Sequence, residues 1–139
     1  MTSAHNIPAN AKKVRQIKLA GVAFVFMYFM LGGIGHFVFT QFFVNIVPAY
    51  IAWAHAAVYI SGVFEILGAL ALCIPTLRRL AGWGLFALTL AVTPANIHMW
   101  LNSELYPDFP PALLALRLVI QVGLLWLIWW STKPIKQLT

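Results

Sequence analysis

The feature that most constrains this chain is a series of four long apolar runs separated by short polar connections. The runs cover about residues 19–39, 55–74, 80–100 and 112–130. A helix needs about 20 apolar residues to cross a bilayer, so each run has the length of one crossing. Charged residues make up only 9% of the chain, against about a quarter in soluble domains. The sequence therefore predicts an all-α integral membrane protein, a four-transmembrane-helix bundle.

Little of the chain lies outside these runs. Residues 1–17 and 131–139 are short tails, and we expect one transmembrane domain without a separate soluble domain. The segment 40–54 is too short to cross again and is interrupted by Asn45 and Pro48. Its aromatic residues are of the type found at the headgroup level. We predict a short interfacial or re-entrant segment between the first two spans.

Basic residues mark the ends of the runs and predict the orientation of the chain. They gather before the first run, between the second and third runs, and after the fourth: Lys12, Lys13, Arg15, Lys18, Arg78, Arg79, Lys133 and Lys136. An even number of spans places all three groups on one side of the membrane. By the positive-inside rule, we expect both termini in the cytoplasm.

The net charge of +6 does not indicate a nucleic-acid partner, because no nucleic-acid motif accompanies it and the charges lie at the ends of spans. We interpret them as topology signals or contacts with anionic membrane lipid. The first run exceeds the roughly 7 to 15 apolar residues of a signal peptide, and no small-residue cleavage site follows it. We expect it to be retained as a span.

Glu65 and Arg117 are the only acid and the only base inside the runs. A lone charge at mid-depth costs at least about 2.5 to 3.5 kcal/mol, and a partner of opposite sign offsets much of that cost. We therefore predict an ion pair or a water-bridged contact between the two. Four other polar residues fall with them in the outer half of the membrane: His36, Asn96, His98 and Gln121. We expect Ser61 to join their network. A shared polar pocket that opens to the outside is the simplest arrangement.

Local spacing supports this convergence. Ser61 lies four residues before Glu65, and Gln121 lies four residues after Arg117, so each pair shares one helix face. A network of this kind also holds helices together without any ligand, and a purely structural role is the alternative interpretation.

Glycine and proline modify two of the spans. Gly32, Gly33 and Gly35 near the end of the first run favour close approach of a neighbouring helix. Pro94 removes a backbone hydrogen bond from the third span and predicts a kink there. Asn96, two residues later, would then cap the freed backbone groups in one interpretation.

A metal site is not expected. Imidazole and carboxylate ligands from His36, His98 and Glu65 would suit Zn, Fe or Cu, but no HxxxH or ExxH spacing accompanies them. The single cysteine, Cys73, has no partner for an internal disulfide. We expect it to be an inert small apolar residue.

Several motifs together resemble one family of small membrane proteins. They are Gly35-His36-Phe37, Ile46-Val47-Pro48-Ala49-Tyr50, Tyr59-Ile60-Ser61-Gly62 with Glu65 and Gly68, Pro75 with Arg78-Arg79, Ala81-Gly82-Trp83-Gly84 and Pro94-Ala95-Asn96-Ile97. In this order, over about residues 20–130, they resemble the DoxX-like family. Ala49 and Ala52 depart from the more proline-rich form that many members have in this segment.

The resemblance implies a four-helix bundle in the bacterial inner (plasma) membrane, related to the DoxD subunit of a thiosulfate:quinone oxidoreductase. We therefore expect a small subunit of a membrane redox system that binds a quinone or similar amphipathic ligand. In this hypothesis Arg117 and His98 donate to ligand oxygens, Glu65 relays protons, and His36 or Asn96 orients the ligand. The chain lacks motifs for flavin, haem or iron–sulfur clusters, so electrons would come from a redox partner subunit.

Two other functions remain open at this point. The first is a non-enzymatic assembly or interaction factor, whose buried polar network fixes the register of the helices. The second is a conduit for protons or a small solute, for which four short helices leave little room. A homo-oligomer is compatible with all three.

Overall fold

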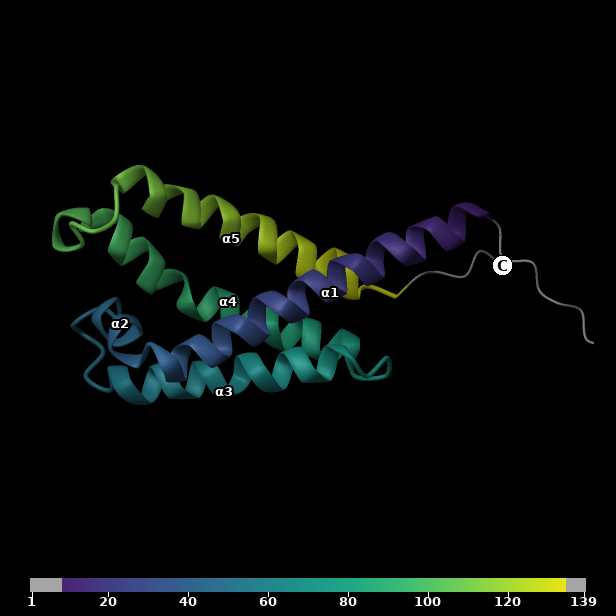
Figure 1. The fold of residues 1–139 in the computed structure, drawn as a ribbon, viewed down its shortest axis with the longest axis horizontal. Coiled ribbons are helices and arrows are strands. Elements are labelled where there is room, and N and C mark those ends of the chain that lie inside the picture. Colours follow the sequence, from purple (N-terminus) through teal and green to yellow (C-terminus); the bar gives the residue numbers. More distant parts are fainter. Residues whose placement is uncertain (1–8, 135–139) are drawn as a thin grey trace, which may run out of the picture.

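The computed structural model describes residues 9–134, which fold into helices joined by short connections (Figure 1). In chain order these are α1 (Ala9–Val38), α2 (Thr40–Asn45), α3 (Ala54–Leu72), α4 (Arg78–Leu101), the 3-10 helix η1 (Ser103–Leu105) and α5 (Pro111–Thr132). Four of them, α1, α3, α4 and α5, are long and apolar enough to cross a membrane. The prediction of an all-α, four-helix membrane bundle is confirmed.

The outer surface of the bundle is apolar. Large hydrophobic side chains are well exposed on the spanning helices, including Phe24 at 59%, Leu31 at 63% and Val122 at 67%. Exposed apolar surface on this scale is unfavourable in water, whereas acyl chains solvate it without cost. Lipid is therefore the solvent for most of this surface, and the protein is a multi-pass membrane protein.

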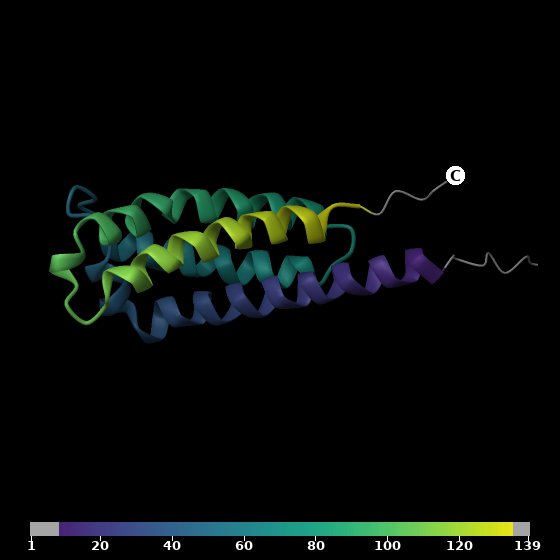
Figure 2. The ribbon, with the colours of Figure 1, turned by 90° about the horizontal axis from the view of Figure 1, so that it is seen from above.

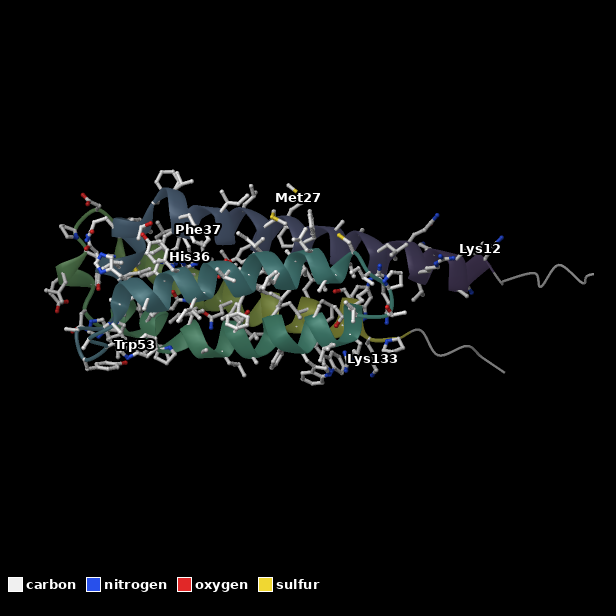
Figure 3. The ribbon with its side chains drawn as sticks, turned by 90° about the horizontal axis from the view of Figure 1, so that it is seen from below. Lys12, Met27, His36, Phe37, Trp53 and Lys133 are labelled. Carbon is white, nitrogen blue, oxygen red and sulfur yellow. The ribbon has the colours of Figure 1, made fainter. Side chains whose placement is uncertain are left out.

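The four spanning helices pack in a ring, in which α1 and α4 each contact both α3 and α5. Figures 1 and 2 show the start of α1 and the end of α5 at one end of the bundle, here called the terminal end. The opposite end, here called the loop end, carries α2 and η1. Figure 3 shows Lys12 and Lys133 at the terminal end and Trp53 at the loop end. An even number of crossings therefore returns the chain to its starting side, as predicted.

Helix boundaries follow local residue chemistry. α5 begins at Pro111, where the missing N–H and the restricted φ of proline suit the first helical turn. α3 ends shortly before Pro75, which cannot continue a helix. α1 begins at Ala9, ten residues before the predicted span, because residues 9–18 contain neither glycine nor proline. The exposed Cys73 lies just beyond α3 rather than inside it.

The segment between α1 and α3 does not cross the bundle. It forms the six-residue helix α2, followed by turns. Ile46 packs with Met99 and Leu114 in a buried apolar cluster, and the hydroxyl of Tyr106 donates to the carbonyl oxygen of Asn45 at 3.4 Å. The segment thus covers the loop end, in agreement with a short non-spanning element.

Two apolar clusters divide the interior along the bundle axis. The larger one lies toward the terminal end: Val22, Val25, Phe29, Ala69, Leu72, Ala81, Leu85, Leu124 and Ile128. The smaller one, at the loop end, contains Ile46, Met99 and Leu114. Along α4 and α5, polar residues such as Thr89 and Gln121 come between the two clusters. The polar side chains therefore lie in a layer with apolar packing on both sides.

α1 and α3 cross with their backbones in close contact at two glycines. A Cβ atom added to Gly33 would lie 2.7 Å from Cγ1 of Ile66 and 2.9 Å from the carbonyl oxygen of Gly62. A Cβ atom on Gly62 would lie 2.9 Å from Cβ of His36. Neither position accepts a side chain without separating the helices. This result agrees with the close approach predicted from the glycines near the end of the first span.

We expect Gly33→Ala to destabilise the bundle by about 1 to 3 kcal/mol, because the added methyl group overpacks the crossing of α1 and α3. Gly123→Ala is the matched control, since no atom lies within 4 Å of a Cβ atom at that position. Thermal unfolding of both variants in the same detergent measures the difference. Equal unfolding midpoints would contradict the tight crossing.

Candidate functional site

A cavity of about 240 Å³ lies among the four spanning helices. Its lining residues come from all of these helices: Tyr28, Phe29, Glu65, Leu88, Thr89, Val92, Asn96, Arg117, Ile120, Gln121 and Leu124. Glu65, Asn96, Arg117 and Gln121, which the sequence placed in one polar pocket, thus face a common space. Their role in ligand binding stays a prediction.

Glu65 pairs with His36 across the interface of α3 and α1. Oε1 of Glu65 lies 3.3 Å from Nε2 of His36, and both residues are buried. A Cβ atom on Gly32 would lie 2.8 Å from Oε2 of Glu65. Glycine at this position therefore makes the room that the carboxylate occupies.

The far side of the His36 ring has different surroundings. The ring stacks on Phe43 with 4.1 Å between the ring centroids, and Nδ1 is buried without a hydrogen-bond partner. A buried imidazole nitrogen without a partner is unusual in proteins. His36 can therefore accept one further polar contact on the side away from Glu65.

Arg117 has a different set of partners from the one predicted. Its Nη2 donates to Oδ1 of Asn96 at 3.1 Å, and its Nη1 donates to the sulfur of Met99 at 3.0 Å. The carboxylate contact of Glu65 is with His36, so the prediction of a direct ion pair between Glu65 and Arg117 is wrong. Both side chains line the same cavity, and a water-bridged contact between them stays a prediction.

Asn96 links Arg117 to a hydrogen-bonded network between α4 and α5. Its amide nitrogen donates to Oε1 of Gln121. The amide nitrogen of Gln121 donates in turn to the hydroxyl of Thr93 and, at 3.3 Å, to the carbonyl oxygen of Thr89. Asn96 therefore does not cap backbone groups freed by Pro94, and its side chain serves the contact between the helices.

Three predicted site residues lie outside the cavity lining: His36, which contacts Glu65 from behind, and His98 and Ser61. His98 is half-buried, and its Nδ1 lies 3.2 Å from the amide nitrogen of Asn102. Ser61 is half-buried one turn before Glu65. The structure therefore does not bring any of the three to the cavity beside Arg117. Within residues 9–134, no group of three or more His, Cys, Asp or Glu side chains is placed to hold a metal ion.

The sequence interpretation missed the two threonines of this network. Thr89 and Thr93 are four residues apart, and Asn96 follows three residues later. This spacing places all three on one face of a helix. A search for polar residues at helical spacing in the third span would have found them.

The chemistry of the cavity follows from its two charged residues. Arg117 carries five N–H donors in a planar fork, and two contacts with Asn96 and Met99 leave some of them for a ligand. Glu65 supplies a carboxylate, and Phe29, Leu88 and Val92 supply apolar walls. The arrangement suits a small ring with a polar oxygen, since binding sites combine apolar walls with a few placed polar groups.

Comparison with known proteins gives a family but no function. No curated protein and no solved structure matches the chain. A family model described as "Domain of unknown function (DUF8561)" matches residues 25–133. The match takes in most of the apolar part of α1, all of α3 and α4, and α5 to its end, including every residue that lines the cavity. The chain belongs to the DUF8561 family.

Proposed function

We propose that the protein is a small subunit of a membrane redox system and binds the headgroup of a quinone, or of a similar amphipathic ligand, in the cavity beside Arg117. The observation that carries this proposal is the presence of Glu65 and Arg117 in one cavity without a direct contact between them. A donor and a carboxylate held apart on opposite helix pairs are free to contact a molecule placed between them.

In this proposal, Arg117 donates to a carbonyl oxygen of the ring. The side chain is held by Asn96, which is itself held by Gln121. A guanidinium oriented in this way loses little conformational entropy when the ligand binds. The sequence predicts that Asn96 orients the ligand, and in this proposal it does so by holding Arg117 in place.

Glu65 is the proposed proton carrier. Reduction of a quinone consumes two protons, and the carboxylate is the only acidic side chain of the cavity lining. His36 contacts Glu65 from behind at 3.3 Å, its ring stacks on Phe43 of α2, and its Nδ1 has no hydrogen-bond partner. A proton taken from Glu65 by the ligand is then replaced through His36. His98, which lies outside the cavity lining, has no part in this proposal.

The dimensions of the cavity agree with a headgroup rather than a whole lipid. Its volume of about 240 Å³ is below the roughly 300 to 1,000 Å³ of sites that enclose drug-sized ligands. Tyr28 and Ile120 line the cavity and are also exposed on the lipid-facing surface. The isoprenoid tail of the ligand leaves between them into the bilayer.

Electrons in this proposal come from a redox partner subunit. The resemblance to the DoxX-like family, with its link to a thiosulfate:quinone oxidoreductase, supports such a partner and a place in the bacterial inner membrane. The three basic groups of the sequence support an orientation with both termini in the cytoplasm.

A second function is favoured by a specific observation. The hydrogen bonds among Asn96, Gln121 and Thr93 are made within the chain and need no ligand. Such a network is what a non-enzymatic assembly or interaction factor requires to fix the register of its helices. The first two experiments below separate the two functions.

We expect Arg117→Gln to weaken binding of decyl-ubiquinone to the purified protein by about ten- to a hundredfold, the effect of losing one charged hydrogen bond. Arg117→Lys keeps the charge but loses the fork, and we expect an intermediate affinity. Lys12→Gln, exposed at the terminal end, is the control. Equal affinity in all variants, with normal unfolding midpoints, would favour the structural function.

Glu65→Gln separates proton transfer from binding, because the amide keeps the shape of the carboxylate but carries no proton to the ligand. We expect normal affinity for decyl-ubiquinone and at least about tenfold slower quinone-linked turnover of the native complex. Glu104→Gln, in the exposed connection at the loop end, is the matched control. Unchanged turnover in a folded Glu65→Gln protein would remove the proton role.

The proposed orientation is tested by cysteine labelling in a Cys73→Ser background. We expect a membrane-impermeant maleimide to label Asp108→Cys in intact spheroplasts, because this position is exposed at the loop end. Lys12→Cys, exposed at the terminal end, is expected to react only after the membrane is opened. The reverse pattern would place the termini outside.

A further inference from the structure

A second and larger cavity lies at the terminal end of the bundle. Its volume is about 400 Å³, and it is bounded by the start of α1, the turn between α3 and α4, and the end of α5. Five of the residues that line it are basic: Arg15, Lys18, Arg78, Arg79 and Lys133. The layer of apolar side chains around Val25, Leu72 and Ile128 separates it from the cavity beside Arg117.

No carboxylate side chain balances these charges. The chain has three acids: Glu65 faces the other cavity, and Glu104 and Asp108 lie in the connection between α4 and α5 at the loop end. Five cations around one space repel each other, and no carboxylate side chain within the bundle neutralises them. Three of them lie over tryptophan rings, which stabilise the charges without neutralising them: Lys18 over Trp130, Arg79 over Trp83 and Lys133 over Trp129. A bound anion would neutralise part of this charge.

The basic side chains are held in place by neutral groups. Lys18 donates to the carbonyl oxygen of Lys133 at 2.8 Å, and Arg78 donates through Nε to that of Leu72 at 2.9 Å. Arg79 donates through Nη1 to the carbonyl oxygen of Trp129 at 3.3 Å. These contacts orient the cations and leave several N–H donors free for a ligand.

A buried hydroxyl completes the site. Ser131 lines the cavity, is only 4% exposed, and its Oγ has no hydrogen-bond partner. The neighbouring Thr132 differs, because its hydroxyl donates to the carbonyl oxygen of Ile128 at 2.7 Å. A buried hydroxyl without a partner costs free energy unless a ligand or water satisfies it. In this cavity it adds a neutral donor to a set of cationic donors.

We propose that this cavity binds a single phosphate group, carried by an anionic phospholipid headgroup or present as free phosphate. Phosphate offers several acceptor oxygens and a negative charge, the chemistry that Arg, Lys and a hydroxyl recognise together. A lipid headgroup fits the surroundings, because Leu19 and Val22, on the first apolar turns of α1, also line the cavity. The site is independent of the proposed quinone cavity.

The test uses the full-length protein, depleted of lipid in neutral detergent and titrated with phosphatidylglycerol, phosphatidylcholine or inorganic phosphate. We expect one phosphatidylglycerol to bind at least about tenfold more tightly than phosphatidylcholine by native mass spectrometry, because a choline cation is repelled by the basic lining. Added NaCl is expected to weaken this binding.

Two lysines on α1 give a matched pair of variants. Lys18 lines the cavity, whereas Lys12, six residues earlier, is exposed and does not. We expect Lys18→Gln to weaken phosphatidylglycerol binding about tenfold, the effect of one charged hydrogen bond, and Lys12→Gln to leave it unchanged. Ser131→Ala, which keeps the charges, is expected to weaken it about fivefold.

Each outcome decides between sources of the phosphate or rejects the site. If inorganic phosphate binds with the same dependence on Lys18 and Ser131, while the two lipids bind alike, the ligand is free phosphate. If Lys18→Gln and Lys12→Gln behave alike toward both phosphatidylglycerol and inorganic phosphate in folded protein, the proposal is overturned. Decyl-ubiquinone affinity, measured in the same variants, stays unchanged in either case.

Discussion

The burial of Glu65 is the constraint on which the rest of this structure depends. A carboxylate in the middle of an apolar helix is costly in lipid, so the bundle has to supply both space and a partner. Gly32 supplies the space beside Oε2, and the close crossing at Gly33 and Gly62 brings His36 to 3.3 Å from the acid. Without that crossing, α1 would stand away from α3, and the carboxylate would lose its contact with the imidazole.

The polar layer is divided into two halves, each belonging to one pair of helices. Glu65 and His36 join α3 to α1, while Arg117, Asn96 and Gln121 join α5 to α4. Figure 1 shows α5 diverging from α1 and α3 toward the loop end, and the cavity with both charges on its wall lies between the pairs. A ligand that contacts both charges would therefore bridge the two helix pairs and add a connection between them.

Much of the fold could be predicted from the sequence, because the length of an apolar run, the basic residues at its ends and the glycines within it each determine structure locally. The lengths of the apolar runs predict the four spans and the non-spanning segment. The even number of spans predicts that both ends of the chain lie on one side of the membrane. The partner of Glu65 could not be predicted in the same way. Helical spacing says which residues share a face, but it leaves open the depth at which two helices cross, and here the crossing selects His36 over Arg117.

Helical spacing also shows that Asn96 and His98 do not share one site. Asn96 and His98 are two residues apart, and side chains at that spacing point to different sides of a helix. They could not both face Arg117, and only Asn96 does. Thr89 and Thr93 lie at the spacing that places them on the face of Asn96, and both belong to the network with Gln121. Polar residues in a span are therefore better assigned by helical face than by charge.

The positions of the two cavities bear on the idea of a conduit. The larger apolar cluster lies between them, and its central residues Val25, Ala69 and Ile128 are fully buried. These aliphatic side chains cannot pass a proton, so a proton path from the terminal end to Glu65 would have to go around them. The ring of His36 stacks on Phe43 of α2, and its Nδ1 is buried without a hydrogen-bond partner. The proposed relay reaches Glu65 through His36 instead, and it requires a proton source at the buried Nδ1 of that ring.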